Sequence, residues 1–75
     1  MSKFDFEAAK RRAERMQLEF PPGTRVKCLF MDDAHAVPNG TEGTVAFVDD
    51  VGTIHVDWDN GSGLGLTEAD RFVKI

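Results

Sequence analysis

Three acidic residues in the second half of the chain have the spacing of calcium ligands. Asp57, Asp59 and Glu68 fall at positions 1, 3 and 12 of an EF-hand loop, whose carboxylates bind the ion. The motif then fails, because Gly61 stands at position 5, where Asp or Asn is usual, and Ser62 stands at position 6, where glycine is required. The flanking residues also show strand patterns instead of helical ones. We therefore expect an acidic hairpin edge here and no metal.

A nucleophile, a base and an orienting acid are also present by type, as Cys28, His55 and Asp57. Nothing beyond residue type supports a catalytic arrangement. Cys28 shares one face of its predicted strand with Val26 and Phe30, which predicts a buried, inert thiol. His55 alternates with apolar neighbours and is expected to face solvent. We expect no enzymatic activity, and a small thiol or metal-dependent enzyme stays as an alternative.

A polar loop at residues 32–43 holds a second set of metal-ligand types. Asp32, Asp33 and His35 could bind a metal, but two or three such residues in a mobile loop are common by chance. A solvated loop is the preferred interpretation, and we expect neither a metal nor another cofactor. Long loops often bind partners, so these three residues and Asn39 are candidate protein contacts.

Four basic residues near the start of the chain could contact nucleic acid: Lys10, Arg11, Arg12 and Arg15. Acidic residues interrupt this run, and Glu7 precedes Arg11 by four residues, a spacing at which helical side chains form ion pairs. Residues 21–75 carry four basic residues against nine acidic ones, a balance that repels phosphate on average. We therefore do not expect nucleic-acid binding, and the basic helix stays as an alternative site for it.

Length and composition predict one small globular domain. The chain has 75 residues, a formal net charge of −4 and 41% apolar residues, which is close to an ordinary globular composition. Its single cysteine cannot form an internal disulfide, which favours a reducing cytoplasm. No apolar run approaches the ~18 residues of a membrane span, so we expect no membrane partner.

Residues 3–19 are predicted to form an amphipathic helix. Apolar residues recur at spacings of three and four and form one stripe: Phe6, Ala9, Ala13, Met16 and Phe20. Pro21 and Pro22 then end the helix, because proline disfavours helical geometry in the residue before it. We expect the stripe to fold back onto its own domain near Leu29 and Met31, which would leave a monomer. A homodimer formed through the helix is the alternative.

The remaining residues predict a mainly β fold. Ile54, Val56 and Trp58 alternate with polar residues, the period of a half-buried strand, and the Asn60-Gly61 pair that follows is typical of a hairpin turn. Five strands are expected, at residues 24–31, 44–48, 53–59, 63–67 and 71–75. The aromatic residues expected in the core are Phe30, Phe47, Trp58 and Phe72. The element order predicts one compact unit, in which a five-stranded SH3-like barrel at residues 21–75 follows the helical segment at residues 1–20.

Six blocks of this sequence resemble a bacterial and phage family of unknown function. They are Pro-Pro-Gly-Thr-Arg-Val at 21–26, Met-Asp-Asp at 31–33, Gly-Thr-Val at 43–45, Val-Asp-Asp at 48–50, Ile-His-Val-Asp-Trp-Asp-Asn-Gly-Ser at 54–62 and Leu-Gly-Leu at 64–66. The resemblance covers Phe20 to Ile75 and leaves the helix outside. It implies a short SH3-like protein associated with phages or conjugative elements, and it assigns no catalytic residues because the family has no established activity. A looser similarity, to Mind-bomb/HERC and KOW-type barrels, lies in the Gly-x-Arg-Val start and the Gly-Thr-Val strand.

Together these patterns predict a non-catalytic protein–protein interaction module with an unidentified protein partner. A phage-encoded inhibitor of a host defence system is one concrete form of this role. The expected contacts are the loop residues named above, the helix stripe where it is uncovered, and three residues of the acidic strand: His55, Asp57 and Asp59. A KOW-like nucleic-acid-binding module that uses the basic helix is the first alternative.

Overall fold

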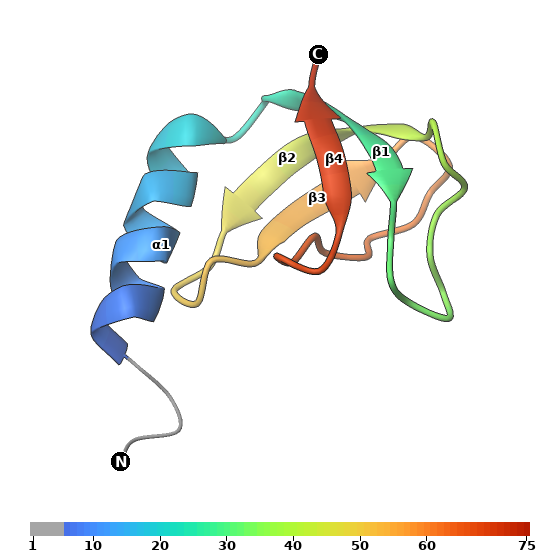
Figure 1. The fold of residues 1–75 in the computed structure, drawn as a ribbon. Helices are drawn as coiled ribbons and strands as arrows, with labels where there is room; N and C mark the ends of the chain where they lie inside the picture. Colours follow the sequence, from blue (N-terminus) through green and yellow to red (C-terminus); the bar gives the residue numbers. More distant parts are fainter. Residues whose placement is uncertain (1–5) are drawn as a thin grey trace.

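A computed structural model of the chain describes residues 6–75, so the predicted start of the helix at residue 3 lies outside the described residues. The elements are α1 (Phe6–Glu19), β1 (Arg25–Phe30), β2 (Glu42–Val48), β3 (Ile54–Trp58) and β4 (Arg71–Lys74). The strands form one antiparallel sheet in the order β3-β2-β1-β4, and α1 lies beside the end of the sheet where β2 turns into β3 (Figure 1). The prediction of a mainly β fold with an N-terminal helix is confirmed. The predicted barrel of five strands is wrong in its count, because the described chain forms four strands in an open sheet.

The helix ends where the prolines predict. Phe20 donates the last helical hydrogen bond to the Met16 carbonyl at 2.8 Å, and Thr24 returns to the Pro21 carbonyl through both its backbone N–H and its hydroxyl. Gly23 takes a positive φ of 93° in this tight connection, a conformation that glycine adopts without strain. The chain therefore enters β1 directly beside the end of the helix.

The two predicted hairpin turns are confirmed, and both have the same geometry. The Gly52 N–H donates to the Asp49 carbonyl at 3.0 Å, as the Gly61 N–H does to the Trp58 carbonyl at 2.9 Å. Each glycine has a φ near 90°, whereas Asn60 does not have a positive φ. This is a three-residue loop, a type I turn followed by a left-handed glycine, instead of a two-residue turn with two positive φ angles.

The predicted strand at residues 63–67 does not form. Register with β3 is kept at both ends, since Trp58 N–H donates to the Ser62 carbonyl and Ile54 exchanges two backbone hydrogen bonds with Leu66. Between them, side chains bind the backbone of Leu64: its carbonyl accepts the Trp58 indole N–H at 2.7 Å, and its N–H donates to the Ser62 hydroxyl. These bonds replace the ladder, so only a single bridge at Leu66 remains.

The core gathers the inward residues of β1, β2 and β3 with residues from the connections: Phe20, Val26, Cys28, Met31, Val37, Val45, Val48, Ile54, Val56, Trp58 and Leu66. The predictions that Trp58 and Cys28 are buried are confirmed, and Phe72 packs on the edge of this cluster. Phe30 and Phe47 were expected in the core, but each is 50% exposed.

Two shifts in strand register explain why these phenylalanines lie outside. One falls at Leu29 in β1 and the other at Ala46 in β2. An extra residue in a strand reverses which positions face inward. Burial therefore resumes at Met31 and Val48, not at Phe30 and Phe47.

The prediction that the helix covers Leu29 and Met31 is wrong. Leu29 is exposed, and Met31 is buried within the core cluster at the end of β1 that lies away from α1 (Figure 1). The reason is the tight connection at residues 20–24, which starts β1 beside the helix and sends it away. The helix instead packs against the 49–52 turn, where an added Cβ on Gly52 would lie 3.7 Å from the Ala13 Cα.

A substitution at Gly43 tests how closely β2 packs against the side chains of β3 near Trp58. An alanine Cβ there would lie 2.6 Å from Val56 Cγ1 and 2.8 Å from Trp58 Cε3, which forces both side chains to shift. We expect Gly43→Ala to lower the free energy of unfolding by about 1–3 kcal/mol in urea denaturation. Gly63→Ala is the matched control, because a Cβ there meets no atom within 4 Å, and its midpoint should stay level or rise slightly. Equal midpoints for both variants would contradict this packing.

Candidate functional site

The outer face of β3 carries two of the predicted contact residues, and a third, Asp59, follows directly after the strand. Asp59 is bound by Arg25 of β1, whose guanidinium nitrogens lie 2.9 and 2.7 Å from its two carboxylate oxygens. These side-chain hydrogen bonds hold the pKa of Asp59 below its ordinary value, against a weaker opposing effect of desolvation. Arg25 also reaches Thr44 and Glu42 of β2, so the pair ties three strands together. Asp59 is therefore occupied within the fold, whereas the exposed Asp57 forms no side-chain hydrogen bond or ion pair with the described residues.

His55 was expected to face solvent, but its side chain makes two contacts within the fold. Its ring stacks on Phe47 at a centroid distance of 4.3 Å, and its Nε2 lies 2.9 Å from Asp49 Oδ2. Asp49 Oδ1 accepts the backbone N–H groups of Val51 and Thr53, which closes the turn between β2 and β3. Desolvation raises the pKa of Asp49, but the hydrogen bonds from His55, Thr53 and Val51 together outweigh it and leave the pKa below its ordinary value. His55 thus braces a hairpin.

The loop candidates do not join the β3 candidates in one site. Asp32, Asp33, His35 and Asn39 are all exposed, and Asp33 Oδ1 accepts the His35 backbone N–H at 2.7 Å. The Asp32 N–H donates to Asp70, which anchors the start of the loop near β4. No hydrogen bond or ion pair in residues 6–75 connects these loop residues with the outer face of β3. The same residues contain no group of three side chains placed to hold a metal ion.

The thiol arrangement is not assembled either. Cys28 is fully buried on the inner face of β1, whereas His55 and Asp57 lie on the outer side of β3, two strands away. Desolvation raises the pKa of the Cys28 thiol, and the negative charge of Asp70 adds to the effect. A thiol in this setting stays protonated and enclosed, so it cannot act as a nucleophile on a solvent-borne substrate.

The basic residues of α1 point in different directions. Arg12 donates to the Val51 carbonyl at 3.1 Å and pairs with Glu68 at 3.6 Å, so it fastens the helix to the β domain. Arg11 lies 3.9 Å from Glu7 one turn earlier. At about 100° per residue, Arg11 and Arg15 lie on one side of the helix, whereas Lys10 and Arg12 are each rotated by about 100° from Arg11, in opposite directions. Because Arg12 is bound to the β domain, the exposed basic residues that share a side are Arg11 and Arg15.

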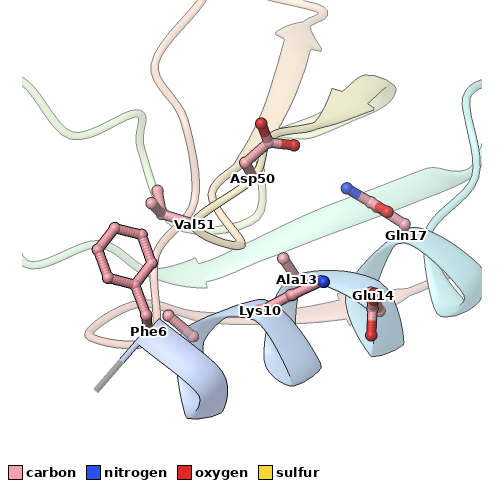
Figure 2. A pocket seen from close by; sticks show the side chains of 8 residues that line it. Phe6, Lys10, Ala13, Glu14, Gln17, Asp50 and Val51 are labelled. Carbon is pink, nitrogen blue, oxygen red and sulfur yellow. The ribbon is translucent and has the colours of Figure 1, made fainter. Parts of the chain in front are cut away.

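A groove of about 390 Å³ runs between α1 and the 49–52 turn (Figure 2). Phe6 and Val51 lie at one end of it, and Ala13 lies near the middle of its helical side. Lys10, Glu14 and Gln17 line the helical wall, and Asp50 lines the wall formed by the turn. Phe6 was predicted to be part of a packed stripe, but it is 77% exposed. Only the later part of the stripe, from Ala13 to Phe20, packs on the domain.

One candidate surface was not predicted from the sequence, because its residues become neighbours only through the pairing of β1 with β4. All four basic residues of segment 21–75 lie on the adjacent strands β1 and β4, and all nine acidic residues lie outside these two strands. Lys27 stands opposite Val73, and Phe30 stands opposite Arg71. The exposed apolar side chains of this part of the sheet gather there as well. We call this the β1/β4 surface; it comprises Lys27, Leu29, Phe30, Arg71, Val73 and Ile75.

Comparison with known proteins supplies a family. A family model described as "Domain of unknown function (DUF4314)" matches residues 9–75. The chain belongs to this DUF4314 family. The match includes most of α1, so the expectation that the helix lies outside the family domain is wrong. We found no significant match to curated proteins or to solved structures. In the described part of this DUF4314 chain, no helix is long and apolar enough to cross a membrane.

The bonds of Asp49 predict an acid-dependent loss of stability in this DUF4314 domain. Because the folded pKa of Asp49 lies below its ordinary value of 3.8, its contribution is complete above that value and is lost as pH falls through the lower folded pKa. Asp49→Asn keeps an oxygen for the turn but removes the ionised carboxylate. We expect the stability gap between parent and variant to be constant above about pH 5 and to shrink below about pH 4 in urea denaturation. Asp50→Asn, in the same turn, is the control for the loss of one charge, because no hydrogen bond or ion pair within residues 6–75 involves the exposed Asp50 carboxylate. A constant gap for Asp49→Asn would refute this role.

Proposed function

We propose that this DUF4314 domain is a non-catalytic protein-interaction module that contacts its partner through the β1/β4 surface. The observation that carries the proposal is the pairing of exposed apolar side chains with unpaired cations. Val73 and Ile75 are 41% and 55% exposed, and Lys27 and Arg71 form no ion pair with any described residue. Grouped apolar surface rimmed by charge is typical of protein-binding sites.

The arrangement of the strands supports an SH3-like architecture for the module. The order β3-β2-β1-β4, with the bridging residue Leu66 beyond β3, follows the chain order of such a domain around one core. In this proposal the 62–66 segment takes the place of a regular strand. The outer faces of β1 and β4 then remain available for a partner.

The placement of the polar groups supports a binding role over catalysis. The candidate nucleophile faces the core, and the histidine is held between Phe47 and Asp49. An inhibitor of a host defence nuclease that imitates nucleic acid has less support, because Arg25 neutralises Asp59. Of the two aspartates on the acidic strand, Asp57 alone then has no ion pair with a described residue. The resemblance to short phage-associated proteins and the single buried cysteine support a bacterial cytoplasm as the setting.

A charge introduced at Val73 tests the proposed interface. We expect Val73→Glu to reduce capture of the partner from extracts of the encoding cell by at least about tenfold, as measured by quantitative mass spectrometry. Val73 faces outward, so the variant should keep the parent's circular dichroism spectrum. The matched control is Leu18→Glu on α1, an apolar residue outside the β1/β4 surface whose side chain is 86% exposed. Capture that is equally strong with both variants would overturn the assignment of this surface.

A further inference from the structure

We propose that the outer edge of β4 binds an extended, acidic segment of a partner protein as an additional antiparallel or parallel strand. This inference rests on the proposed interaction function and names its mode and its chemistry. The observations behind it are the hydrogen-bonding state of the sheet edges and the distribution of charge beside them.

The β4 edge has unpaired backbone groups. β4 pairs with β1 on one side, and the Ile75 N–H donates to the Arg25 carbonyl at 3.0 Å. Backbone groups alternate in direction along a strand, so those of Val73 and Ile75 point to β1 and those of Phe72 and Lys74 point away from the sheet. No segment within residues 6–75 pairs with this outer side.

The opposite edge of the sheet is closed. Ile54 of β3 exchanges hydrogen bonds of 2.9 and 2.8 Å with Leu66, and the Trp58 N–H is bound by the Ser62 carbonyl. The 62–66 segment therefore covers β3, and a further strand can join the described sheet only at β4.

The side chains beside the edge specify an acidic segment. Arg71 and Lys74 lie on β4 itself, and Lys27 lies next to it on β1, while the acidic residues of segment 21–75 lie elsewhere. The Lys74 ammonium lies 5.1 Å from the centre of the Phe20 ring, at the rim of the core. Because side chains alternate along a strand, Lys74 lies on one face of β4, and Arg71 lies on the other face with Val73 and Ile75. A strand with a carboxylate opposite Lys74 and apolar residues opposite Val73 and Ile75 matches both the charge and the apolar surface.

Charge also selects between occupants. Pairing two copies of this protein through β4 would place Arg71 and Lys74 of one copy beside those of the other, and like charges across a strand pair are destabilising. A nucleic-acid backbone has phosphate acceptors but no row of N–H donors for the outward carbonyls of Phe72 and Lys74. An acidic peptide meets both the donors and the acceptors of the edge.

The first test uses synthetic peptides and the full chain. The probe is a seven-residue peptide in which glutamate alternates with valine. We expect it to bind with a Kd of about 10–100 µM in NMR titration and to slow hydrogen exchange of the Phe72 and Lys74 amides. A peptide with lysine in place of glutamate should bind at least about tenfold more weakly. The glutamate peptide should also bind at least about tenfold more weakly when N-methyl groups block its backbone amides along both edges. If the peptide methylated along both edges bound as tightly as the unmethylated peptide, strand addition would be overturned, and tighter binding of an oligothymidylate than of the peptide would assign the surface to nucleic acid instead.

The second test compares two substitutions at Lys74. Both Lys74→Gln and Lys74→Pro remove the charge and the contact with Phe20, but only proline also removes the outward N–H, which β1 does not use. Lys74→Gln should weaken peptide binding by about twofold to fivefold, and Lys74→Pro by at least about tenfold more than that. Equal weakening by the two variants would refute the strand mode. If Lys74→Pro still captured the cellular partner while Val73→Glu lost it, the interaction function would stand and strand addition would fail.

Discussion

The seating of Trp58 is the constraint on which the rest of the sheet depends. Its side chain fills the space beside Gly43, where an added Cβ would collide with the ring, and its indole N–H binds the Leu64 carbonyl at 2.7 Å. The chain after the hairpin is thereby pulled over the ring and returns to β3 only at Leu66. This path replaces a regular strand ladder with a single bridge, but it covers the edge of β3 and encloses an aromatic side chain in a thin core. Because this edge is covered, the open edge of the molecule is at β4.

Local patterns predicted the parts of the fold that are decided locally. The alternation of Ile54, Val56 and Trp58 and the glycine after Asn60 require only neighbouring residues to form a strand and a turn, and both are found. The prolines after Phe20 likewise end the helix wherever it packs. The predicted strand at 63–67 does not form because the side chains of Trp58 and Ser62 bind the backbone of Leu64 in place of a strand ladder. A pattern of apolar alternation contains no information on that competition.

The candidate site was less predictable, because it depends on register between distant segments. A shift of one residue at Leu29 and another at Ala46 moves Phe30 and Phe47 to the outside. Asp59 was correctly placed at an acidic edge, but its partner Arg25 lies on another strand, so the sequence could not show that the carboxylate is already bound. The cations of β1 and β4 become neighbours only through the pairing of Lys27 with Val73. Their grouping is a property of the sheet order and not of any stretch of sequence.

This charge separation lets an acidic protein present a cationic edge. Adjacent strands lie about 4.8 Å apart, so β3 is roughly 14 Å from β4, whereas the Debye length at physiological ionic strength is about 8 Å. At that ionic strength the charge of the Asp57 carboxylate is largely screened from a ligand bound on β4. Arg71 and Lys74, in contrast, attract that ligand at contact distance. Arg25 lies between the two regions and neutralises Asp59 within the sheet, which lowers the repulsion further. An acidic strand is consequently attracted at one edge of the sheet and repelled from the other, which fixes where it binds.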